Sequence, residues 1–179
     1  STGKATDGNS GAVLIASGEA DSNGGAIQIT SGDATISSGA ILITGGTGSG
    51  GAGGDLTLSA GNVDDATAKG GSVSIRSGTS EKTSSGDLTI ASPNAGTAGL
   101  TGKIEMTTGE SASAVSGLIR LSSGKSVGDS SGLLSLSSGE ATTGTSHHSG
   151  AILIGSGAAS GCSGAILITG GTGSGGAGG

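Results

Sequence analysis

The sequence contains no Phe, Tyr or Trp, and only one Pro, one Cys and one Met in 179 residues. Aromatic side chains supply much of the buried area of ordinary domains, so their absence excludes an ordinary globular core. The single proline and the lack of a strict three-residue glycine period exclude a collagen triple helix. Long helices are not expected either, because the chain has 42 glycines and no apolar stripe with a 3.6-residue period.

Positive charge is also scarce: seven Lys and Arg against 13 Asp and Glu give a net charge of −6. Without a basic cluster or base-stacking aromatics, nucleic-acid binding is excluded. The longest aliphatic run, residues 12–16, is far too short for a membrane span. No signal peptide is visible, and the chain begins at Ser1 with its only methionine at Met106, which suggests a processed chain or part of a longer one.

What the sequence does contain is one short phrase, repeated eleven times at spacings of 14 to 18 residues. The phrase is Gly-x-aliphatic-x-aliphatic-x, usually followed by Ser-Gly, and we number its copies 1 to 11. The opening glycines are Gly11, Gly25, Gly39, Gly54, Gly71, Gly86, Gly102, Gly117, Gly132, Gly150 and Gly164. The aliphatic pairs are Val13 and Ile15, Ile27 and Ile29, Ile41 and Ile43, Leu56 and Leu58, Val73 and Ile75, Leu88 and Ile90, Ile104 and Met106, Ile119 and Leu121, Leu134 and Leu136, Ile152 and Ile154, and Ile166 and Ile168.

This alternation predicts that each phrase is one short strand with its aliphatic pair on one face. An array of such units predicts an all-β fold: a parallel β-solenoid of about eleven coils of 14–18 residues, forming a single domain over residues 1–179. The aliphatic pairs would form its core ladder. The closing glycines, such as Gly18 and Gly78, would turn the chain at positive φ, and the connection after Pro93 would turn differently. A flexible Gly/Ser linker is the alternative, but a linker has no need of periodic aliphatic residues.

Opposite charges fall at equivalent positions of neighbouring phrases and favour the same alignment. These positions are Glu105 with Arg120, Asp87 with Lys103, and the row Glu110, Lys125 and Glu140.

A longer repeat overlies the short one. Residues 38–54 recur unchanged at residues 163–179, an offset of 125, which suggests a piece of a longer array; local duplication is the alternative. No cap is evident at either end, and bare strand edges readily pair with another chain. Leucines at outward positions would make apolar lateral contacts. These leucines are Leu14, Leu42, Leu118, Leu133, Leu153 and Leu167.

No group of residues predicts a catalytic, cofactor or metal site. Residues 128–132 match G-x-S-x-G, but no helix is expected to follow. Residues 50–55 match the start of a calcium-binding G-G-x-G-x-D repeat without recurring in neighbouring phrases. His147 and His148 have no Cys, Asp or Glu beside them, so a metal would need ligands from another chain. Cys162 could form an interchain disulfide or be a small buried residue.

The phrases GGAIQITSG, SGAILITGG and GGDLTLSAG resemble the glycine- and serine-rich repeats of surface fibre and adhesin proteins from microalgae such as diatoms, from bacteria and from phage tail fibres. The resemblance covers nearly the whole chain and is one of composition. It implies an extracellular, repetitive β-solenoid fibre with an adhesive or scaffolding role, and it implies no catalytic residue.

The expected function is therefore that of a structural filament or fibre protein at the cell surface or outside the cell. Its expected partner is itself, through end-to-end or lateral contacts, and its hydroxyl-rich surface would suit O-glycans. We expect neither enzymatic activity nor a cofactor. The alternative is an ice-binding or other surface-ligand-binding solenoid, although no Thr-x-Thr row persists over consecutive phrases.

Overall fold

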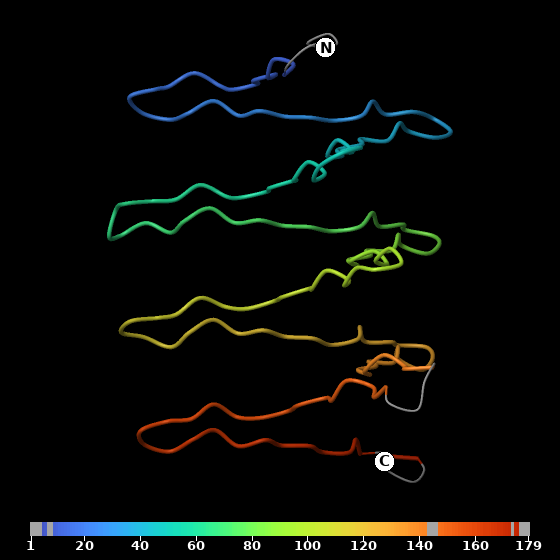
Figure 1. Ribbon diagram of the computed structural model, residues 1–179. Coiled ribbons are helices and arrows are strands. Elements are labelled where there is room, and N and C mark those ends of the chain that lie inside the picture. The colour runs from blue at the N-terminus through green and yellow to red at the C-terminus, as the bar shows by residue number, and fades with distance from the viewer. Residues whose placement is uncertain (1–4, 7–8, 143–146, 173, 176–179) are drawn as a thin grey trace. The chain divides into compact units, whose positions relative to one another are not determined.

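The computed structural model describes residues 5–6, 9–142, 147–172 and 174–175. Over these residues the backbone forms neither helix nor strand, and Figure 1 draws it as a plain trace without coiled ribbons or arrows. The chain divides into two units, Ser1–Thr89 and Ile90–Gly179, with the boundary inside phrase 6. Both units contain the same alternation of aliphatic phrase and polar connection.

The predicted all-β fold is wrong: the described chain has no sheet, so it is not a parallel β-solenoid. A strand in a sheet needs a ladder of hydrogen bonds to a neighbour. In the described residues, four backbone hydrogen bonds occur, all within connections or at their ends, and none joins two phrases along their lengths. Side chains alternate with a two-residue period in any extended backbone. The alternation therefore predicts an extended segment but does not predict a second segment that pairs with it.

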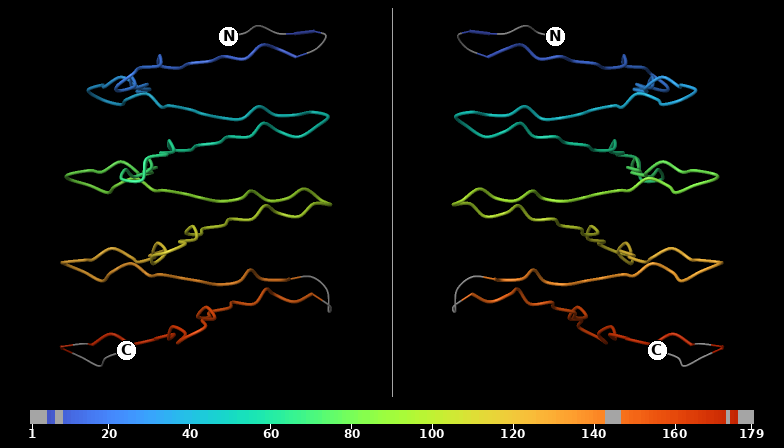
Figure 2. Two further views of the ribbon diagram at one scale, coloured as in Figure 1. Left: turned by 90° about the vertical axis from the view of Figure 1, so that its left-hand side faces the viewer. Right: turned by 90° about the vertical axis from the view of Figure 1, so that its right-hand side faces the viewer.

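Successive phrases are nevertheless related by a repeated local contact. At nine of the ten junctions, the seventh residue of a phrase lies close to the opening glycine of the next, which brings the two ends of the connection together; a Cβ placed on Gly164, at the tenth junction, would have no atom within 4 Å. A Cβ placed on Gly25 would lie 3.3 Å from that of Ser17, and one on Gly39 would lie 3.7 Å from that of Ser31. The same arrangement recurs at Ala60 with Gly71, Ser77 with Gly86, Ser92 with Gly102, Thr108 with Gly117, Ser123 with Gly132, and Ser138 with Gly150. Figure 2 shows such loops between the extended stretches of the trace.

Three of these loops are also closed by a backbone hydrogen bond from the opening glycine to the eighth residue of the preceding phrase. The N–H groups of Gly54, Gly71 and Gly86 donate to the carbonyl oxygens of Gly46, Gly61 and Gly78 at 2.8, 2.9 and 2.9 Å. A single bond at the neck of a loop fixes where two phrases meet but leaves the rest of each phrase unpaired.

Limited steric space, and not left-handed backbone, favours glycine at four of the opening positions, Gly25, Gly54, Gly71 and Gly117. A Cβ on Gly71 would lie 3.1 Å from the Ala60 Cβ, and one on Gly117 would lie 3.2 Å from the Thr108 Cγ2. By contrast, the closing glycines predicted to adopt positive φ, including Gly18 and Gly78, do not do so. That prediction was wrong because the chain reverses within the polar connection and not at the closing Ser-Gly.

No described residue is buried, polar or apolar. The structure exposes 17435 Å² of surface at a mass of 16.1 kDa. A globular monomer of this mass exposes about 7,400 Å² and its unfolded chain about 23,000 Å². The described part of the chain therefore has organised connections but no hydrophobic core.

Candidate functional site

The aliphatic residues form the largest set of side chains that could make contacts, and all of them are exposed. Side chains of the 22 predicted ladder positions range from 48% exposed at Ile119 to 85% at Ile168. The six predicted lateral leucines are 82–93% exposed. In phrase 3, Leu42 is 84% exposed while its neighbours Ile41 and Ile43 are 49% and 58% exposed. Phrase 3 thus has two sides that differ in exposure, whereas in phrase 11 Ile168 is as exposed as Leu167, at 85% and 83%. The burial of the aliphatic pairs remains a prediction.

A recurring serine organises three of the polar connections. Ser80, Ser111 and Ser126 each stand two residues after a closing glycine and six residues before the next opening glycine. Each hydroxyl oxygen accepts a hydrogen bond from the backbone N–H three residues ahead. The donors are Thr83, Ala114 and Asp129, at 3.0, 3.2 and 3.2 Å. Serine hydroxyls stabilise turns in this way.

The serine pattern was missed at the sequence level, although its signal is visible there. The segments GTSEKTSSG, GESASAVSG and GKSVGDSSG share Gly-x-Ser at the start and Ser-Gly at the end. The last of these segments contains the G-x-S-x-G match, and its Asp129 carboxylate accepts the Ser130 N–H at 2.7 Å. The G-x-S-x-G match therefore lies in a loop whose conformation is stabilised by hydrogen bonds within the loop.

Asp65 organises a longer connection, residues 62–70, by a related arrangement. Its Oδ1 accepts hydrogen bonds from the backbone N–H of Thr67 at 2.7 Å and from the Thr67 hydroxyl at 2.6 Å. The Thr67 hydroxyl, followed by the Thr67 and Ala68 backbone N–H groups, lowers the pKa of the Asp65 carboxyl, because these donors favour the charged form. Its neighbour Asp64 is exposed.

The connection after Pro93, which was predicted to turn differently, has the same close approach of Ser92 to Gly102 as the other connections and carries a further hydrogen bond at its neck. Pro93 replaces the usual closing glycine. Here the Ser92 hydroxyl donates to the carbonyl oxygen of Gly102 at 2.9 Å. Within the loop, the Gly99 N–H donates to the Gly96 carbonyl oxygen at 3.3 Å.

The charges do not pair as the sequence predicted. Lys103 forms an ion pair with Glu105 of the same phrase. No ion pair joins Glu105 to Arg120 in the described residues. Side chains two residues apart project from the same side of an extended segment, so Glu105 finds a partner without a neighbouring phrase.

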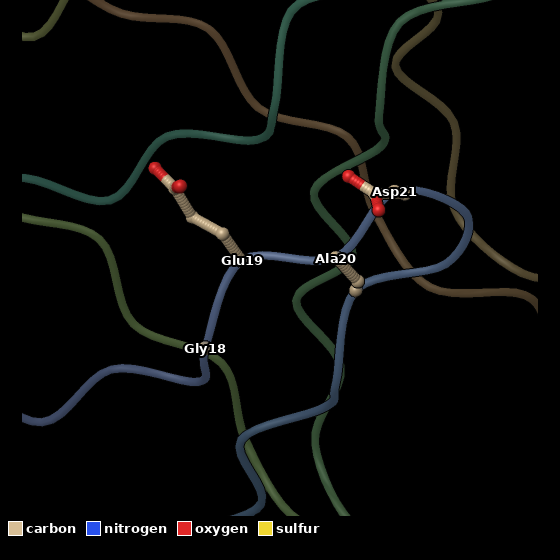
Figure 3. Close-up of a pocket in the computed structure, with 5 residues that line it drawn as sticks. Gly18, Glu19, Ala20 and Asp21 are labelled. Carbon is tan, nitrogen blue, oxygen red and sulfur yellow. The ribbon is translucent and has the colours of Figure 1, made fainter.

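One shallow hollow of about 500 Å³ is open to solvent in the first connection and is lined by Gly18, Glu19, Ala20, Asp21 and Gly24. Figure 3 shows the Glu19 and Asp21 side chains extending from the same stretch of this loop. A cation site in a protein usually needs more oxygen ligands than two carboxylates. The hollow alone therefore does not define a binding site.

The remaining candidate metal-binding and disulfide residues are isolated side chains. His147, His148 and Cys162 are all exposed, so Cys162 is not the small buried residue that was one of its two interpretations. Over residues 5–6, 9–142, 147–172 and 174–175, no three His, Cys, Asp or Glu residues are grouped closely enough to hold a metal ion. The second copy of the long repeat, residues 163–179, lies partly outside these ranges.

No family model, no curated protein and no solved structure matches the chain. The described part of the chain also contains no helix that is long and apolar enough to cross a membrane.

Proposed function

We propose that this chain is a structural segment of an extracellular filament or fibre with a scaffolding or adhesive role. The observation that carries the proposal is the exposure of every periodic aliphatic side chain. Extended apolar surface on a soluble chain marks a contact surface. Because the same phrase recurs eleven times, one kind of contact can repeat along the molecule, as a filament requires.

The proposed partner is another copy of the same chain. In phrases 1, 3 and 10 the aliphatic pair is less exposed than the leucine between its two members, and at nine of the ten junctions the seventh residue of one phrase lies close to the opening glycine of the next. Contacts between aliphatic sides of several copies would remove these side chains from water, at about 25 cal/mol per Å². The mechanism needs no residue that acts as an acid, a base or a nucleophile.

The exposed polar side chains support the extracellular part of the proposal. Most described serines and threonines are exposed, so hydroxyl groups are accessible for hydration, for adhesion and for O-glycans. Labelling of intact and permeabilised source cells with an antibody tests the location, since a cell-surface protein is labelled without permeabilisation. Loss of mass from the natural protein on β-elimination tests for O-glycans.

Self-association can be tested with two variants of equal charge. One replaces Ile41, Ile104 and Ile119 by Asp, and the control replaces the sixth residues of the same phrases, Thr44, Thr107 and Ser122, by Asp. We expect the wild-type chain and the control to form large species as concentration rises, visible by sedimentation and electron microscopy. The first variant should remain monomeric, because charges at the aliphatic positions would be buried without partners. Equal behaviour of the two variants, or a monomeric wild-type chain at all concentrations, would overturn the proposal.

A further inference from the structure

The first connection contains a dipeptide with chemistry of its own, Asn23–Gly24. Four asparagines lie in the described residues, and only Asn23 precedes a glycine; Asn9, Asn62 and Asn94 precede Ser, Val and Ala. All four asparagines are exposed. The residue that follows the asparagine therefore distinguishes Asn23 from the others, and exposure does not.

Gly24 is exposed, and the space beside its Cα is open. A Cβ built on Gly24 would have no atom within 4 Å. In the described part of the chain, neither the Asn23 amide nor the Gly24 N–H takes part in a hydrogen bond. Glycine also allows backbone conformations that other residues rarely adopt. The Gly24 nitrogen can thus approach the side chain of the residue before it.

We infer that Asn23 is a site of spontaneous deamidation by cyclisation onto Gly24. The Gly24 nitrogen attacks the Asn23 Cγ; a bond forms between them while the bond from Cγ to the side-chain nitrogen breaks. That nitrogen leaves as ammonia and carries the proton lost from the Gly24 nitrogen. Water then adds to either carbonyl of the five-membered imide and opens it, giving aspartate or isoaspartate.

The product changes the connection in two ways. A new carboxylate joins the exposed Glu19 and Asp21 in the same loop. Isoaspartate also adds a methylene group to the main chain two residues before Gly25, which lies so near Ser17 at the end of the loop that a Cβ placed on it would be 3.3 Å from the Ser17 Cβ. The reaction therefore alters both the charge and the closure of the link between phrases 1 and 2.

The chain provides an internal control for the rate. No Lys or Arg lies between Lys4 and Lys69, so one tryptic peptide contains Asn9, Asn23 and Asn62. After the full chain is incubated at mildly alkaline pH, fragment-ion mass spectrometry of this peptide measures conversion at each position. Because the β-branched Val63 restricts approach to Asn62, we expect conversion at Asn23 to be at least about tenfold faster, or ~1.4 kcal/mol in activation free energy.

Two alanine variants separate cyclisation from simple hydrolysis. Gly24→Ala adds a methyl group beside the attacking nitrogen and should slow conversion at Asn23 by about tenfold. Gly18→Ala, also in open space in the same loop, should leave the rate unchanged. Isoaspartate should form together with aspartate, and water labelled with oxygen-18 should add one labelled oxygen. Conversion at Asn23 no faster than at Asn62, an unaffected Gly24→Ala variant, or aspartate without isoaspartate would each overturn the inference.

Discussion

Short polar side chains determine local conformation in this chain. The Asp65 carboxylate accepts two hydrogen bonds from Thr67, and the Ser92 hydroxyl donates to the carbonyl of Gly102. The Asp65 bonds join residues two apart in sequence, the Ser92 bond joins the two ends of one connection ten residues apart, and both form without a core. Such side chains compete effectively with regular secondary structure for backbone partners.

The hydrogen bonds to Asp65 make its connection sensitive to pH. Since they lower the folded-state pKa of Asp65 below its ordinary value, their stabilisation is present above the ordinary pKa and is lost as the pH falls through the lowered one. Thr67→Val removes the hydroxyl, which is the largest cause of the shift, and keeps the backbone N–H. The pKa of Asp65 should therefore rise toward its ordinary value in that variant, as measured by a carboxyl-carbon NMR titration. The control Thr57→Val should leave the titration unchanged; the same response in both variants would contradict the assigned hydrogen bond.

At the scale of elements, the repeating unit is an extended phrase followed by a loop closed at its neck. The phrase boundaries were predictable, because opening glycines and aliphatic pairs recur in the sequence and the seventh-residue contact follows the same interval. The serine-centred loops of Ser80, Ser111 and Ser126 could also have been predicted from their shared Gly-x-Ser. Whether phrases pair with one another could not be predicted from the sequence, because the alternation of aliphatic residues describes a single extended segment. A ladder of hydrogen bonds requires two segments.

The serine loop that contains Ser111 can be tested by amide hydrogen exchange. Ser111→Ala removes the acceptor of the Ala114 N–H, a bond of 3.2 Å. A hydrogen bond of this type contributes about 1 kcal/mol, so exchange at Ala114 should accelerate roughly fivefold. Ser113→Ala lies in the same loop and should not change that rate. If Ala114 exchanges at the same rate in wild type and in Ser111→Ala, the serine does not organise the loop.

At the scale of the whole molecule, the composition correctly predicted that the described part of the chain has no ordinary globular core. The solenoid prediction was wrong because it assumed that the aliphatic residues would be buried within one chain. The first residues of the aliphatic pairs, such as Ile27 and Leu134, are about half exposed, except Val13, which is 70% exposed. No large aromatic side chain can bridge the distance between extended phrases, because the sequence has none. Under the proposed self-association, neighbouring molecules would remove these residues from water.

Unfolding of the isolated chain should differ from that of a domain of equal length. A globular domain of 179 residues unfolds cooperatively with a heat-capacity increase of about 2.5 kcal/mol/K, because apolar surface becomes exposed. In dilute solution this chain has no buried residue to expose in its described part, so calorimetry should show no cooperative transition and urea should change circular dichroism gradually. If copies associate through their aliphatic sides, a transition should appear as concentration rises and move to higher temperature, because association stabilises the bound state by mass action. The variant with Asp at positions 41, 104 and 119 should show no cooperative transition at any concentration. A sharp, concentration-independent transition in the dilute wild-type chain would mean that one molecule forms its own core.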